Sequence, residues 1–172
     1  MNDAALREGR TGFAGAVAAV ITGWALLGGA VLLLVVAMNV ASVIGAIFWA
    51  PFPGDFEMTE VGVAVAAFMF LPYCQLSDSN VTADIFTARS GPRAIAWFKF
   101  VASVTAFLFA LLMLWRMYAG MLDQRDYNYT TAILQFRLWW AFVPILVSLA
   151  LLAVASLLTL IESGRIAARS GA

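Results

Sequence analysis

The residues whose side chains are best suited to carry out chemistry lie in the stretch LPYCQLSDSNVTADIF, residues 71–86. It contains Cys74, the only cysteine of the chain, followed by Asp78, Asn80 and Asp84. A thiolate and carboxylates at short spacing can bind a metal ion or support redox chemistry. The alternative is that this stretch marks the point where a membrane segment returns to water.

The composition argues against a reactive site in this stretch. The sequence has no histidine and one cysteine, which excludes histidine-bound metal, b-type haem ligation, a Ser–His or Cys–His catalytic pair and an intrachain disulfide. The spacing of the carboxylates also differs from that of a calcium-binding loop. We therefore predict that the chain is not an enzyme and has no catalytic residue, metal site or bound cofactor, and that Cys74 is a small packing residue.

The hydrophobicity of the chain predicts a membrane protein. Of its 172 residues, 63% are hydrophobic and 12% are charged, whereas about a quarter of the residues of a soluble domain are charged. The formal net charge is zero, so no basic surface is available for nucleic acid.

The chain contains four segments without charged residues, and each is a candidate membrane span. Charged residues are absent from residues 11–54, 61–77, 100–115 and 138–161. A helix needs about 20 apolar residues to cross the hydrocarbon core, a length that the second and third segments reach with their flanking residues. We predict an all-α membrane protein with one membrane domain over residues 1–172. Its four transmembrane helices are expected near residues 16–40, 57–77, 95–118 and 138–161. The first charge-free segment is too long for one ordinary span and too short for two, so we expect a long or tilted helix there.

Two segments between these spans are expected to lie at the membrane surface. The sequence IFWAPFPGDFE, residues 47–57, combines helix breakers with aromatic residues, which is typical of a return at the membrane–water boundary. After span two, residues 77–80 can cap a new helix. The apolar residues that follow can share one face, so we expect a short amphipathic helix near residues 81–89.

The distribution of lysine and arginine predicts the orientation, because these residues are enriched in cytoplasmic segments. We expect both termini and the second loop to be cytoplasmic, with the first and third loops outside. The side expected to be cytoplasmic carries Arg7, Arg10, Arg89, Arg93, Lys99, Arg165 and Arg169, and the other side carries Arg116, Arg125 and Arg137.

The span centres hold no ionisable residue, although such residues usually mark a substrate or proton path. Asn39 can hydrogen-bond to another helix, Trp24 is expected to pack inside the protein, and Trp139 and Trp140 occupy an aromatic-belt position. The chain is therefore expected to pack against a larger membrane partner rather than to form a conduit.

Several motifs, taken in order, resemble the small membrane subunit (DctQ-like, Q subunit) of tripartite ATP-independent periplasmic (TRAP) transporters. Asn39–Val40 resembles the Asn-Val late in helix one of the family, and PGDFE, ending at Glu57, resembles its entry to helix two. The spacing from Glu57 to Asp84, NVTAD at 80–84, and LQFRLWWAFVP at 134–144 also correspond. The chain departs from the family pattern at Val43, Asn80 and Arg137, where the family has arginine, histidine and proline.

The resemblance implies a non-catalytic, multi-pass subunit of the bacterial inner membrane. Such transporters take up small organic acids by symport with sodium. The implied partners are the lipid bilayer, a large polytopic membrane subunit that holds substrate and sodium, and a periplasmic substrate-binding protein. The small subunit would brace the scaffold of the large one and help to dock the binding protein.

Five residues are candidates for the partner interface, and two other functions stay open. The candidates are Asn39, Glu57, Asp84, Trp139 and Trp140; for Glu57 and Asp84 the alternative is a solvated charge that only flanks a span. A haem-free membrane anchor of a respiratory or quinone-linked complex would have a similar size and hydrophobicity. A self-contained small transporter is the third possibility.

Overall fold

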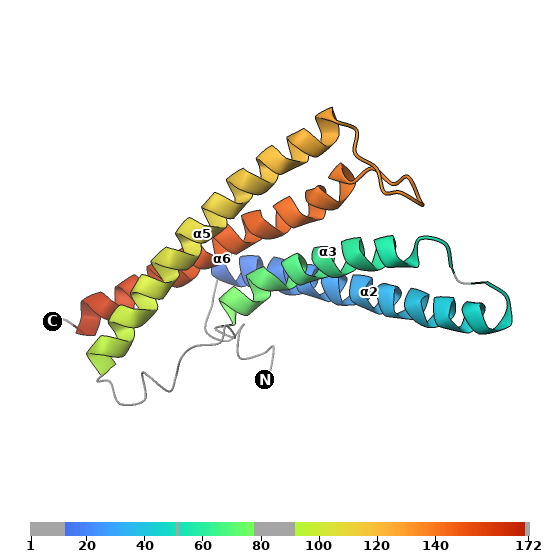
Figure 1. Ribbon diagram of the computed structural model, residues 1–172. Helices are drawn as coiled ribbons and strands as arrows, with labels where there is room; N and C mark the ends of the chain where they lie inside the picture. Colours follow the sequence, from blue (N-terminus) through green and yellow to red (C-terminus); the bar gives the residue numbers. More distant parts are fainter. Residues whose placement is uncertain (1–12, 51, 78–91, 171–172) are drawn as a thin grey trace.

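The chain folds into four long helices (Figure 1). The computed structural model describes residues 13–50, 52–77 and 92–170. The helices are α2 (Phe13–Phe48), α3 (Asp55–Leu76), α5 (Pro92–Asp126) and α6 (Trp139–Ser170). The predicted all-helical architecture with four long apolar helices is therefore confirmed, whereas the short helix expected near residues 81–89 lies outside the described residues.

Each helix contains a segment long and apolar enough to cross a membrane. The first helix continues beyond the span expected near residues 16–40, because α2 ends only at Phe48. With 36 residues in α2 and 35 in α5, a rise of 1.5 Å per residue makes each about 50 Å long, against about 30 Å for the hydrocarbon core. These two helices must tilt strongly or extend beyond the hydrocarbon.

The helices form an open row in the order α2, α3, α6, α5 rather than a closed ring (Figure 1). α5 packs along α6, α6 along α3, and α3 along α2, while α2 and α6 meet only marginally. The antiparallel pairs α2–α3 and α5–α6 diverge toward the end where residues 49–54 and 127–138 connect their helices, as Figure 1 shows. We call this end the loop end.

Alanine and larger aliphatic side chains form the core in two clusters. One cluster joins α3, α5 and α6 around Met69, Ala110 and Leu149, and a second joins α2, α3 and α6 around Ile21 and Ala155. Large apolar side chains on the outer faces stay exposed. A surface of this kind suits a lipid environment or a membrane partner.

Two glycines permit the close approach of α2 to α3. A β-carbon at Gly28 would lie 2.8 Å from Cβ of Met69, and one at Gly62 would press against the side chain of Val35, whereas a β-carbon at Gly23 would meet nothing within 4 Å. Glycine at membrane-helix interfaces lets backbones approach and gain van der Waals contact. The glycines at positions 28 and 62 therefore help to set the α2–α3 distance, and that at position 23 does not.

Few side-chain hydrogen bonds cross between helices in the middle of the row. Trp24 Nε1 in α2 donates to Ser148 Oγ in α6 at 2.9 Å, and Ser148 Oγ donates to the Pro144 carbonyl at 2.7 Å. Gln75 Nε2 in α3 donates to Thr159 Oγ1 in α6 at 3.2 Å. Trp24 thus packs inside the protein, as its position in the sequence indicated.

Candidate functional site

Gly54 makes the turn that leads into α3. Its φ of 82° lies in the left-handed region, which glycine adopts without steric cost. The side chain of Leu134, from the connection between α5 and α6, packs directly over it: a β-carbon at position 54 would lie 2.5 Å from Leu134 Cγ. The first and third connections of the chain therefore touch at this glycine.

Glu57 joins the same two connections through hydrogen bonds. Its Oε1 accepts the backbone N–H of Ile133 at 2.8 Å, and its Oε2 accepts that of Leu134 at 3.1 Å. A carboxylate that accepts two adjacent backbone N–H groups fixes both their position and their direction, because charge-assisted bonds are short and directional. We call this contact of Glu57 and Gly54 with residues 131–136 the clasp.

The segment held by the clasp has a defined shape of its own. Thr131 and Phe136 close a turn, since Thr131 N donates to the Phe136 carbonyl at 3.0 Å and Phe136 N to Thr131 Oγ1 at 3.1 Å. Gln135 has a φ of 50°, a left-handed conformation that lets the chain reverse. Thr130 and Arg137 form an antiparallel bridge below the turn. The carboxylate therefore binds a preformed hairpin.

Polar contacts tie α2 to the entry of α3 next to the clasp. The Ser42 hydroxyl donates to the Asp55 carboxylate and accepts the Phe52 N–H at 3.1 Å. Asn39 Nδ2 donates to Thr59 Oγ1 at 2.7 Å and to the carbonyl of Val35, in its own helix, at 2.8 Å. Asn39 thus bonds to a second helix, which its place in an apolar span made possible.

Two tryptophans begin α6 at the same end. The rings of Trp139 and Trp140 are 5.2 Å apart and tilted by 37°, and the Arg125 guanidinium lies 6.0 Å from the Trp139 ring centre. An arginine at this distance from an indole face is at the limit of a cation–π contact. The contact links the last turn of α5 to the first turn of α6.

The structure gathers most of the residues singled out from the sequence at the loop end. Glu57 lies in the first turn of α3, Trp139 and Trp140 in the first turn of α6, and Asn39 in the last third of α2. Asp84 lies outside the described residues. Cys74 is a free, partly buried thiol, and no group of three or more metal-ligating side chains occurs among the described residues.

Sequence reasoning missed Gly54 as a contact, the hairpin at 131–136 and the partner of Glu57. The signals were local and weak: Pro53–Gly54 was interpreted as a helix break, and Thr131 and Gln135 belong to a polar loop without a motif. A contact between positions 76 apart leaves no local pattern in one sequence. The arrangement can hold a surface in a defined shape.

Comparison with known protein families gives one match that covers most of the chain. The family model described as tripartite ATP-independent periplasmic transporters, DctQ component, matches residues 32–165. Comparison with curated proteins and with solved structures gave no match. The matched range includes the clasp, the Ser42 and Asn39 contacts and the tryptophan pair. With four helices able to span a membrane, the chain is a multi-pass membrane protein that belongs to the DctQ family, the small membrane subunits of TRAP transporters.

Proposed function

We propose that this chain is the non-catalytic small subunit of a sodium-coupled uptake system for small organic acids in the bacterial inner membrane. In this role it braces the fixed scaffold of a large polytopic subunit, which holds substrate and sodium. It also helps to dock a periplasmic substrate-binding protein. The chain itself needs no bound cofactor for this role.

The open row of helices is the observation that carries the proposal. A substrate path through one subunit needs helices arranged around it, and here α2 and α5 form the two edges of a row. The polar groups Trp24, Ser148 and Asn39 bond to one another or to neighbouring helix groups. A row with long exposed apolar faces is suited to lie against a larger membrane protein.

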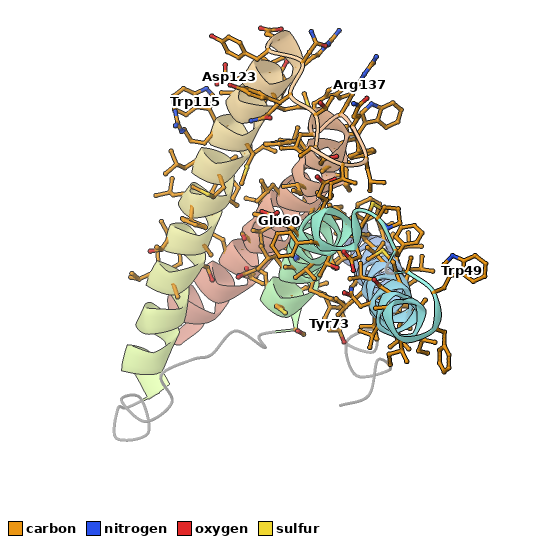
Figure 2. All side chains as sticks on the ribbon, turned by 45° about the vertical axis from the view of Figure 1, so that its right-hand side comes forward. Trp49, Glu60, Tyr73, Trp115, Asp123 and Arg137 are labelled. Atoms are coloured by element: carbon orange, nitrogen blue, oxygen red, sulfur yellow. The ribbon has the colours of Figure 1, made fainter. Side chains whose placement is uncertain are left out.

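The loop end supports the docking role. The clasp holds the two connections in one surface, and several large side chains at this end are exposed. Trp49 is 95% exposed and points away from the rest of the molecule (Figure 2); Tyr127 and Tyr129 are also exposed. Aromatic residues are enriched at protein interfaces. The lysine and arginine distribution supports a periplasmic loop end and cytoplasmic termini, with the amphipathic helix near residues 81–89 on the cytoplasmic surface.

Co-purification tests the proposal most directly. A tagged chain extracted in mild detergent from its native host is expected to bring down a much larger polytopic protein. Recovery of the chain alone, under conditions that preserve other membrane complexes, would contradict the scaffold role. Sodium-dependent organic-acid uptake should require the large partner, the binding protein and this chain together, so uptake by the chain alone in liposomes would also contradict the role.

The family match does not favour a haem-free respiratory anchor. That alternative makes a separate prediction, because an anchor subunit would carry quinone. Quinone extraction from the purified complex is expected to yield no stoichiometric quinone. A quinone bound one to one, together with a redox partner, would support the anchor instead.

A further inference from the structure

An open recess lies between α3, α5 and α6 near the loop end. Its volume is about 450 Å³, within the range of about 300–1,000 Å³ typical of small-ligand sites. Apolar side chains form its walls, among them Val61, Ala64 and Phe68 of α3, Met117 of α5, and Phe142 and Ile145 of α6. From Glu60 to Phe68 the α3 wall extends about 12 Å along the helix axis.

Glu57 and Glu60 bring two carboxylates to the lining of this recess, and that of Glu60 has no partner in the part of the chain that the structure describes. It is exposed on the second turn of α3, and among the described residues it forms no hydrogen bond or ion pair. Figure 2 places it on the side of α3 that faces α6. Glu57, by contrast, uses both oxygens in the clasp. A carboxylate without a counter-charge at the boundary of a span can accept charge-assisted hydrogen bonds from a cationic group at the membrane surface.

We propose that the recess binds one chain of an aminophospholipid, with the lipid ammonium group at Glu60. The apolar walls match an acyl chain, and the carboxylate matches the headgroup amine in charge and hydrogen bonding. Thr131 of the clasped hairpin and Leu138, just after it, also line the recess. The lipid would therefore fill the gap where the two helix pairs diverge.

The lining of the recess favours a lipid over a helix of a partner protein. Apolar walls beside one carboxylate without a partner match an acyl chain that ends in a charged headgroup.

The proposal can be tested on the full chain in its membrane complex. The purified complex is placed in nanodiscs with equal amounts of phosphatidylethanolamine and phosphatidylglycerol, extracted again in mild detergent, and analysed by native mass spectrometry. We expect one phosphatidylethanolamine to be retained in preference to phosphatidylglycerol. Glu60→Gln should lower that preference about fivefold, as expected for a partly exposed ion pair.

Matched variants separate the recess from general lipid contact. Ala64→Phe places a ring inside the recess and should abolish the retained lipid. Ala67→Phe, also exposed and on the same helix but outside the recess, should retain it. Asp123→Asn, in the last turn of α5 at the loop end (Figure 2) and outside the lining of the recess, removes a different carboxylate and should leave the lipid preference unchanged.

Three results would overturn the proposal. These are equal retention of the two lipids, no effect of Glu60→Gln, or equal effects of the two phenylalanine variants. Retention only after the large partner has been removed would show instead that a partner side chain occupies the recess. Uptake is not measured, so failure here is distinct from failure of the scaffold role, which co-purification tests.

Discussion

The loop end and the middle of the helix row are held together by different kinds of contact. At the loop end, Glu57, Ser42 and Asn39 make directional hydrogen bonds to the backbone or to side chains of other segments. In the middle, apolar side chains pack in clusters that include Ala110 and Ala155. Directional bonds specify one position for a loop, whereas apolar packing mainly specifies a distance between helices.

This contrast suggests that the middle of the row and the loop end have different roles within one subunit. Packing in the middle fixes the distances between the helices of the row, whose outer faces meet lipid or a partner. The loop end presents a surface of fixed shape. A change in the middle should therefore appear mainly as lost stability. A change in the clasp should appear mainly as lost function.

Removal of the Glu57 carboxylate should have the largest effect on function. Glu57→Ala leaves the N–H groups of Ile133 and Leu134 without their acceptor, so the hairpin loses its position and uptake by the complex should fall severalfold. Glu57→Gln keeps one acceptor oxygen, so uptake by this variant should lie between that of the wild type and that of Glu57→Ala. Asp84→Ala is also predicted to lower uptake. The measurement is substrate uptake by cells that express the whole system.

Two controls show whether these losses come from the small subunit. The affinity of the binding protein for substrate should be unchanged, and Asp123→Asn, an exposed carboxylate outside the clasp, should transport normally. Wild-type uptake by the Glu57 and Asp84 alanine variants would remove both residues from the interface.

The α2–α3 contact should show the largest effect on stability. Gly28→Ala forces a methyl group against Met69 Cβ and should destabilise the protein by about 1–3 kcal/mol. Gly23→Ala adds the same methyl group where nothing lies within 4 Å and should be neutral or stabilising by about 0.5–1 kcal/mol. Thermal unfolding in one detergent compares the two variants. Equal shifts would mean that glycine 28 does not set the helix distance.

Gly54 should contribute through both its backbone conformation and the space that it leaves. Gly54→Ala places a β-carbon at a positive φ, which costs about 1–2 kcal/mol, and it also pushes against Leu134. Adding Leu134→Ala should remove the destabilisation caused by the steric clash, but not the destabilisation caused by the positive φ. A double-mutant cycle on unfolding free energy would measure the coupling, and strict additivity would show that the two residues do not touch.

Loss of one hydrogen bond in the middle should have the smallest effect. Trp24→Phe removes the donor to Ser148 but leaves that hydroxyl bonded to the Pro144 carbonyl. Interhelical bonds in membrane proteins average about 0.6 kcal/mol, so the destabilisation should be of that order. Cys74→Ala provides a near-neutral reference. If Trp24→Phe instead lowered the unfolding free energy by several kcal/mol, directional hydrogen bonds would be important in the middle of the row as well. The contrast between the middle and the loop end would then not hold.

The sequence was sufficient to predict the helices but not their exact ends. Four charge-free segments predicted four apolar helices because a span needs continuous hydrophobicity. The length of the first charge-free segment predicted a long or tilted first helix, but not that α2 ends at Phe48, because helix continuation depends on local backbone bonding. The Trp49 N–H still bonds to the Gly45 carbonyl at 2.7 Å.

The candidate site was only partly predictable, for a different physical reason. Asn39 stood out because an amide within an apolar segment needs a hydrogen-bond partner, but nothing nearby in the sequence identified Thr59. Glu57 stood out by its place in a motif, whereas its acceptor role depends on a hairpin formed elsewhere in the chain. Glu60 was treated only as the charged boundary of span two. Its position in the lining of a recess depends on how α3 packs against α6.

The clasp also constrains the order in which the protein can be assembled during synthesis. Glu57 and Ile133 are 76 positions apart, so their contact can form only after α5 and the connection that follows it have been translated. Until then the carboxylate depends on water for its hydrogen bonds. The clasp is therefore a late step of biogenesis rather than a nucleus for it, and its closure reports that the connection after α5 has reached the entry of α3.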